Sequence, residues 1–72
     1  MYVGYQYDSF SDHLVFKSAL TVQEVLLAFE TLGNEMPLAC IYDFSAKDFI
    51  EYDIRFKKYK QLFLHHIETF KF

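Results

Sequence analysis

FIEYDIRF, residues 49–56, is the segment that separates two interpretations of this 72-residue chain. Its apolar side chains alternate with mostly charged ones, which is the period-two pattern of a half-buried strand. On a continuous helix, Ile50 and Ile54 would lie roughly 150–170° from the centre of the aromatic stripe, among charged residues. On a strand they share a face with Tyr52 and Phe56. The segment therefore predicts a strand at about 49–56.

The residues that follow this strand have helical spacing. We expect a helix from about 58 to 70, because apolar residues recur there every three or four positions. The residues that it should bury are Tyr59, Leu62, Phe63, Ile67 and Phe70. A second interpretation stays open, because aromatic residues from Phe49 to Phe70 also fit one long C-terminal helix capped by Ser45.

The segment before residue 49 predicts the strand's partner. Residues 38–44 are nearly all apolar and rich in β-formers, which is typical of a central strand buried on both faces. A turn at Ser45–Asp48 would let this strand pair with 49–56.

The N-terminal segment predicts a β-hairpin. Residues 1–7 alternate, with Val3, Tyr5 and Tyr7 on one face. A polar turn over 8–12 follows, in which Asp and Ser side chains can bond nearby backbone. A second strand then runs from about 13 to 18.

A capping box predicts the first helix. In Thr21-Val22-Gln23-Glu24, the Thr21 hydroxyl can accept a hydrogen bond from the Glu24 amide, and Glu24 can reach back to the Thr21 amide. Helically spaced apolar residues follow, and Gly33-Asn34 supplies a stop because both residues tolerate the left-handed conformation.

These elements predict one α+β domain over residues 1–72 in the order ββαββα. We expect a four-stranded, mainly antiparallel sheet with two helices on one face. The opposite face would then meet solvent or a partner. The alternative fold is ββαβ followed by one long C-terminal helix.

Composition limits how so small a domain can be stabilised. A single core of this size supplies roughly 3–5 kcal/mol, and Cys40, the only cysteine, excludes an intrachain disulfide. With nine Phe and six Tyr, some rings should remain exposed and mark an interaction site.

The sequence contains no pattern typical of catalysis, of a metal site or of a cofactor site. His65 and His66 are adjacent, so on a helix they point about 100° apart and are badly placed to chelate one metal. Cys40 has no activating neighbour, and we expect it to fill a buried strand. The carboxylates Glu51 and Asp53 are explained by pairing with nearby bases. We therefore expect a protein that is not an enzyme and binds no cofactor.

The candidate partner-binding site centres on residues 55–60, where basic and aromatic side chains are interleaved. Interfaces are enriched in Tyr, Phe and Arg, which favours contact with a protein. Charge on phosphates and rings on bases is also how single-strand binders work, so a small nucleic-acid-binding regulator is the alternative. The net charge of −3 argues against the latter. The predicted contact residues are Tyr5, Tyr7, Arg55, Lys57, Lys58, Tyr59 and Lys60.

The expected function is a small non-catalytic protein-binding module. Amino-acid usage, with Lys far more frequent than Arg, is typical of AT-rich phage and mobile-element genomes. We expect an inhibitor or regulator from such an element that blocks a host protein sterically. A homodimer is compatible with this function.

The sequence also predicts where the protein acts. Met1 to Phe10 lacks the basic region and apolar stretch of a signal peptide, and no run approaches the ~18 apolar residues of a membrane span. We expect a complete small gene product in the cytoplasm (the host cytoplasm, if phage-encoded) with no membrane partner.

Overall fold

The structure is a computed structural model, and it describes residues 1–30 and 38–69. The described elements follow the order ββαββα, which confirms the predicted α+β class. Their bounds are β1 Tyr2–Asp8, β2 His13–Ala19, α1 Val22–Glu30, β3 Cys40–Asp43, β4 Asp48–Glu51 and α2 Arg55–Thr69.

The four strands form one antiparallel sheet in the order β2-β1-β3-β4. The predicted hairpin is confirmed: β1 and β2 pair without a bulge from Tyr2↔Ala19 to Asp8↔His13. β1 also pairs with β3, and β3 with β4. The two central strands are therefore β1 and β3, and β2 and β4 are the edges.

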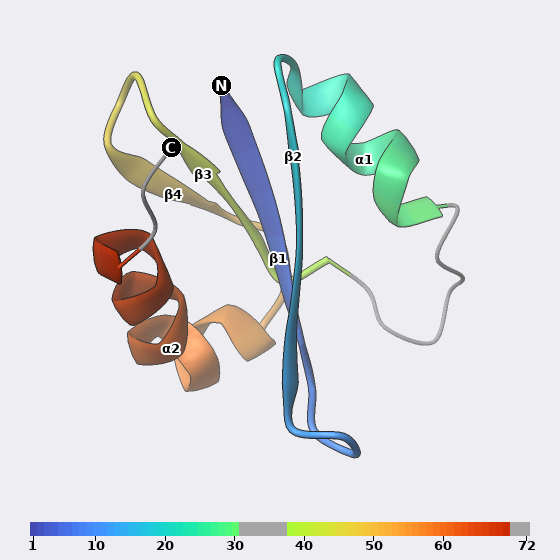
Figure 1. Cartoon of the computed structure of the whole chain (residues 1–72), viewed down its shortest axis with the longest axis vertical. Helices are drawn as coiled ribbons and strands as arrows, with labels where there is room; N and C mark the ends of the chain where they lie inside the picture. The colour runs from blue at the N-terminus through green and yellow to red at the C-terminus, as the bar shows by residue number, and fades with distance from the viewer. Residues whose placement is uncertain (31–37, 70–72) are drawn as a thin grey trace.

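The two helices cover opposite faces of the sheet (Figure 1), so the prediction of both helices on one face is wrong. Successive strand side chains point to opposite faces. Accordingly Cys40 packs in the core under α2, whereas its neighbour Ile41 packs in the core under α1. Both side chains are completely buried, so the expectation that this strand is covered on both faces is confirmed.

The core under α1 is small, and it closes over a glycine. Val25 and Phe29 of α1 pack with Ile41 of β3. A Cβ atom at Gly4 would lie 2.5 Å from Val25 Cγ1 and 2.6 Å from Phe29 Cε2. Gly4 is needed here because α1 occupies the space that a side chain would take.

The core under α2 is built from large rings. Tyr5 and Phe63 are completely buried with their ring centroids 5.5 Å apart, and Phe56 stacks on Phe63 at 6.3 Å. Aromatic pairs at such distances contribute about 0.5–1.5 kcal/mol beyond their area burial. This face therefore holds the larger apolar contribution to stability.

The predicted capping box is confirmed in its first half, because the Glu24 amide donates to Thr21 Oγ1 at 3.2 Å. The proposed stop at Gly33-Asn34 and the burial of Phe70 fall outside the described residues.

The last third of the chain differs from the prediction at its boundaries. β4 ends at Glu51 rather than near 56, and α2 begins at Arg55 rather than near 58. The cause is Asp53, whose carboxylate accepts a hydrogen bond from the Arg55 amide at 2.9 Å and whose carbonyl accepts one from the Phe56 amide. A side-chain acceptor at this position starts a helix.

The alternative of one long C-terminal helix is also wrong, since β4 precedes α2. Along α2, Phe63 is buried as predicted, and Tyr59 and Ile67 are half-buried against the same core. Leu62 is 46% exposed, so its predicted burial is wrong. Neither helix, as far as the chain is described, is long and apolar enough to cross a bilayer.

Candidate functional site

The turn between β1 and β2 is held by its own polar side chains. The Asp8 carboxylate accepts hydrogen bonds from the Phe10 amide at 3.0 Å and the Ser11 hydroxyl at 2.6 Å. The Ser11 hydroxyl is the main cause of a pKa of Asp8 below its ordinary value. Asp12 adopts a left-handed conformation with a φ of 55°, which Asp tolerates better than most residues.

This turn fixes Tyr7 against α2. The Tyr7 hydroxyl donates a hydrogen bond to Asp12, and this bond raises the pKa of Tyr7 above its ordinary value. The Tyr7 ring packs on the Tyr59 ring with centroids 4.2 Å apart. Lys58 Nζ lies 5.3 Å from the centroid of Tyr59, within reach of a cation–π contact.

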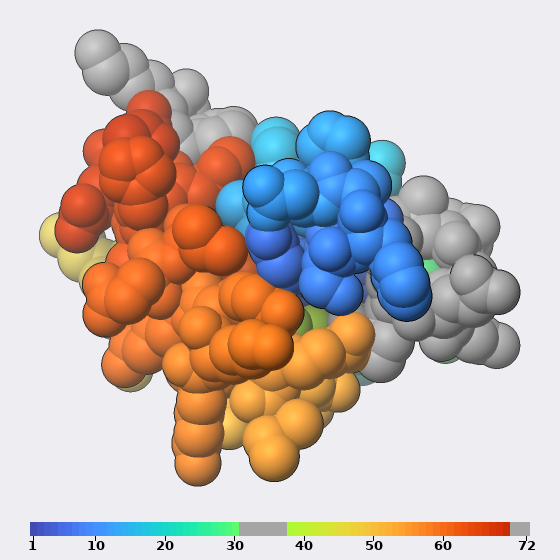
Figure 2. Space-filling view, turned by 90° about the horizontal axis from the view of Figure 1, so that it is seen from below, coloured from blue at the N-terminus to red at the C-terminus, as the bar shows by residue number. Residues whose placement is uncertain are grey.

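Figure 2 shows this end of the molecule, where the β1–β2 turn (blue) lies beside the first turns of α2 (orange). We call Tyr7, Lys58 and Tyr59 the basic-aromatic surface; Lys57, two residues before Tyr59, points to another side of α2. The two lysines are exposed and the two tyrosines are half-buried. The surface therefore presents positive charge, from Lys58, beside a packed pair of rings.

The remaining predicted contact residues have other surroundings. The placement of Tyr5 on an exposed face is wrong, because its side chain is 0% exposed inside the α2 core. Arg55 Nε binds the Asp53 carboxylate at 2.9 Å, which ties this guanidinium to the start of the helix. Lys60 is exposed, with its Nζ 5.9 Å from the Phe56 ring.

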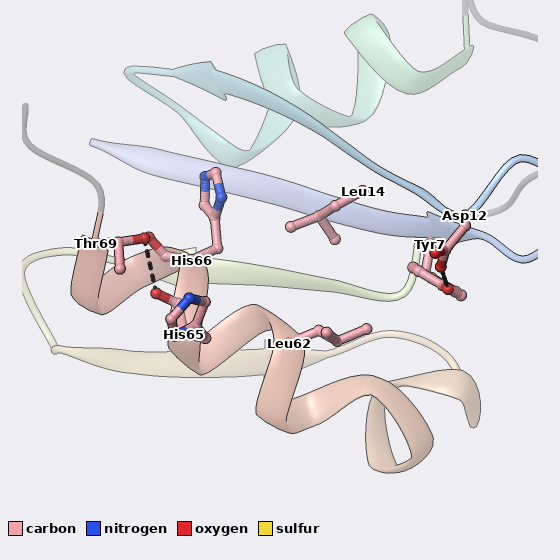
Figure 3. Close-up of a pocket in the computed structure, with 7 residues that line it drawn as sticks. All are labelled: Tyr7, Asp12, Leu14, Leu62, His65, His66 and Thr69. Carbon is pink, nitrogen blue, oxygen red and sulfur yellow. Dashed lines mark hydrogen bonds between the residues drawn. The ribbon is translucent and has the colours of Figure 1, made fainter.

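A cavity of about 330 Å³ lies next to the basic-aromatic surface, between α2 and the β1–β2 hairpin (Figure 3). Leu14 points from β2 toward α2, and His66 points from α2 toward the strands. Leu62 extends along the cavity toward Tyr7 and Asp12. The lining residues are Tyr7, Asp12, Leu14, Leu62, His65, His66 and Thr69.

His66 forms the inner end of this cavity. Its ring contacts Tyr5 edge-on at 5.2 Å and Phe16 at 4.7 Å. Burial, with a smaller contribution from the charge of His65, lowers the pKa of His66 below its ordinary value. Burial thus favours the neutral imidazole, whose ring lies among the aromatic side chains under α2.

Leu62, His65 and Thr69 line the cavity and were not predicted from the sequence as site residues, whereas Lys58 was. Lys58, Leu62, His65 and Thr69 are spaced four, three and four residues apart, so they share one flank of α2. This spacing was the signal that could have found them. The aromatic stripe one residue further on hid it, because that stripe accounts for the helix by itself.

Other candidate groups are accounted for structurally. Cys40 is completely buried, and burial raises the pKa of its thiol to about 12. Asp43 accepts hydrogen bonds from the Ser45 and Ala46 amides in the β3–β4 turn. Within residues 1–30 and 38–69, no three His, Cys, Asp or Glu side chains gather as metal ligands.

Comparison with known proteins adds no relative, because no protein-family model, curated protein or solved structure matches this chain. The arrangement that remains is a fixed pair of tyrosine rings, an exposed lysine and an adjacent partly apolar cavity. Such an arrangement can bind a partner without catalysing a reaction.

Proposed function

We propose that this chain is a protein-binding module that acts by occupying a surface of an acidic partner protein through its basic-aromatic surface. One observation carries the proposal: Tyr7 and Tyr59 pack at 4.2 Å, and Asp12 and Lys58 engage their polar and ring groups. Rings that are already fixed lose little conformational entropy when a partner binds. Tyr and basic side chains around a partly desolvated centre are typical of interface hot spots.

The same geometry makes the nucleic-acid alternative weaker. A single-strand binder stacks bases on open ring faces. Here the Tyr7 and Tyr59 rings face each other, and Lys58 lies over Tyr59. The expected role as a phage or mobile-element inhibitor is compatible with the proposal and rests on amino-acid usage.

Capture from a cell lysate by the immobilised protein tests the proposal, with and without nuclease. Lys58→Glu reverses the charge within the basic-aromatic surface, and Lys47→Glu makes the same change in the β3–β4 turn as a matched control. We expect capture of the partner protein to persist after nuclease treatment and to be unchanged for Lys47→Glu. We expect Lys58→Glu to bind the partner at least about tenfold more weakly.

Two results would contradict the proposal. Capture that disappears with nuclease and weakens steeply with salt would establish nucleic acid as the partner. Equal capture by both charge-reversed variants would remove the basic-aromatic surface from the interface.

A further inference from the structure

Within residues 1–30 and 38–69, no strand pairs with the outer side of β2, which is one edge of the sheet. β2 spans seven residues, His13–Ala19, and in the described sheet its only partner is β1. Every second residue of such a strand points its backbone N–H and C=O away from the sheet. Those groups are a template on which another extended chain can pair.

β2 has less of the usual protection of an edge than β4. Natural edges are kept short, charged or interrupted by proline or a bulge. The other edge, β4, follows this rule with four residues, of which Asp48 and Glu51 are acidic. β2 is longer and unbulged, contains no proline and exposes Phe16, and Lys17 is the one Lys, Arg, Asp or Glu in it.

The cavity lies beside β2, where it could receive a side chain of a strand added to this edge. Leu14 of β2 lines it on one side, and Leu62 and His65 of α2 line it on the other. A strand paired with β2 would point alternate side chains to the α2 face of the sheet. Strand addition of this kind takes affinity from backbone hydrogen bonds and specificity from pockets for alternate side chains.

Charge indicates the chemistry of the added strand. α2, whose His66 ring contacts Phe16 of β2, carries four basic side chains and one acidic, and β2 adds Lys17. α1 packs against the other face of β2 and carries two acidic side chains, Glu24 and Glu30. The whole chain has seven basic and ten acidic residues, so all segments other than β2 and α2 together carry two basic and nine acidic. The α2 side of this edge is thus more basic than the rest of the chain, although the Asp12 carboxylate lines the cavity.

We propose that β2 docks an extended, acidic segment of the partner protein, which adds to the sheet as a further strand and places one apolar side chain in the cavity. This inference rests on the proposed function and specifies how the partner binds. Tyr7 and Leu14 supply the apolar wall, and the Asp12 carboxylate is already engaged by Tyr7.

A second copy of the chain fits this edge less well. Pairing β2 with β2 of a second copy would bring the basic elements of both copies together. Like charges in an interface are destabilising, so the same surface that favours an acidic segment disfavours itself.

The test uses random seven-residue peptides, matched in length to β2, displayed as a library and selected on the native protein. We expect selected peptides to contain acidic residues and one apolar residue, and to shift the amide NMR signals of β2. N-methylation at successive peptide positions then tests the geometry. Alternate positions should lose about tenfold in affinity and intervening ones little, because only every second N–H faces β2.

Paired variants test the cavity. Leu62→Glu places a charge at the cavity, and Leu27→Glu makes the same change on α1, across the sheet. Both leucines are well exposed, at 46% and 61%, so both variants should fold. We expect Leu62→Glu to weaken the selected peptides about tenfold or more and Leu27→Glu less than about twofold.

Four outcomes would overturn the inference: no selected peptide, NMR shifts away from β2, N-methylation tolerated at every position, or a dimer formed through β2 in sedimentation. Failure here is distinguishable from failure of the proposed function. A captured protein that is lost with Lys58→Glu but not displaced by a β2-binding peptide would keep the function and reject the strand addition.

Discussion

The two faces of the sheet are packed by opposite means. On the α1 face, β1 presents Gly4, and Val25 and Phe29 fill the space that a Cβ would occupy. On the α2 face, the next residue is Tyr5, whose ring lies between β1 and Phe63 of α2. Side chains of α1 contact the β1 backbone at Gly4 directly, whereas aromatic rings lie between the β1 backbone and α2.

The candidate site lies on the ring-packed face. On the α1 side, the space that a Cβ at Gly4 would take is filled by the helix side chains. Interposed rings on the α2 side support the helix along its centre and leave the 330 Å³ cavity along its flank. The aromatic residues thus stabilise the centre of the α2 face, and the candidate binding site lies at the edge of that face.

The largest expected effect is on the ring-packed face. Phe63→Ala removes a completely buried ring that contacts Tyr5 and Phe56. We expect it to lower the free energy of unfolding by about 3–5 kcal/mol, which is most of the stability of so small a domain. Urea titration followed by circular dichroism measures the loss. Phe10→Ala, at a fully exposed ring in the turn, is the control and should change stability by less than about 0.5 kcal/mol.

Gly4→Ala should destabilise the closely packed face by about 1–3 kcal/mol, because the added methyl overlaps Val25 and Phe29. Val25 Cγ1 is the nearest atom, so Gly4→Ala combined with Val25→Ala should cost less than the sum of the two single changes. Strict additivity in this double-mutant cycle would show that α1 does not limit the space at Gly4.

Tyr5→Phe should act in the opposite direction. The Tyr5 hydroxyl is buried and has no hydrogen-bond partner among the described residues, and burial raises its pKa. Removing an unsatisfied polar group while keeping the ring should stabilise the protein by about 1 kcal/mol. A lower thermal midpoint for Tyr5→Phe would indicate that the hydroxyl is satisfied in solution.

The smallest effect concerns how the two helices start. Hydrogen bonds from Arg55 hold the pKa of Asp53, at the start of α2, below its ordinary value. Its contribution to stability is therefore present above the ordinary carboxyl pKa, about 3.9, and is lost as pH falls through the lowered value.

The free energy of unfolding should fall less between about pH 7 and about pH 3 in Asp53→Asn than in the wild type, as measured by urea titration at each pH. Thr21→Ala at the neutral cap of α1 should instead cost about 1 kcal/mol at both pH values. Parallel pH profiles for wild type and Asp53→Asn would contradict the role of the Asp53 charge.

Much of the fold was predictable because local signals agree with tertiary structure. Alternation located β1 and β2, and Thr21 located the start of α1. The end of β4 was missed because the alternation of Ile50, Tyr52 and Ile54 continues past it. Asp53 was the competing signal, since a side-chain acceptor two residues before Arg55 starts the helix.

The layer arrangement was missed although the sequence contained its signal. A strand such as β3, with both Cys40 and Ile41 apolar and buried, requires cover on both faces. The candidate site was predictable only in part. Tyr7 and Tyr59 are far apart in sequence and meet through tertiary packing, and the burial of Tyr5 depends on which face α2 covers.

Cys40 gives the protein a built-in reporter of its own opening. The thiol lies in a central strand with both faces covered, and its pKa of about 12 leaves almost no thiolate in the native state. A thiol reagent should therefore label only molecules in which the sheet has come apart. Labelling rates in plain buffer would then report the fraction of open molecules at any moment, without denaturant and without an added probe.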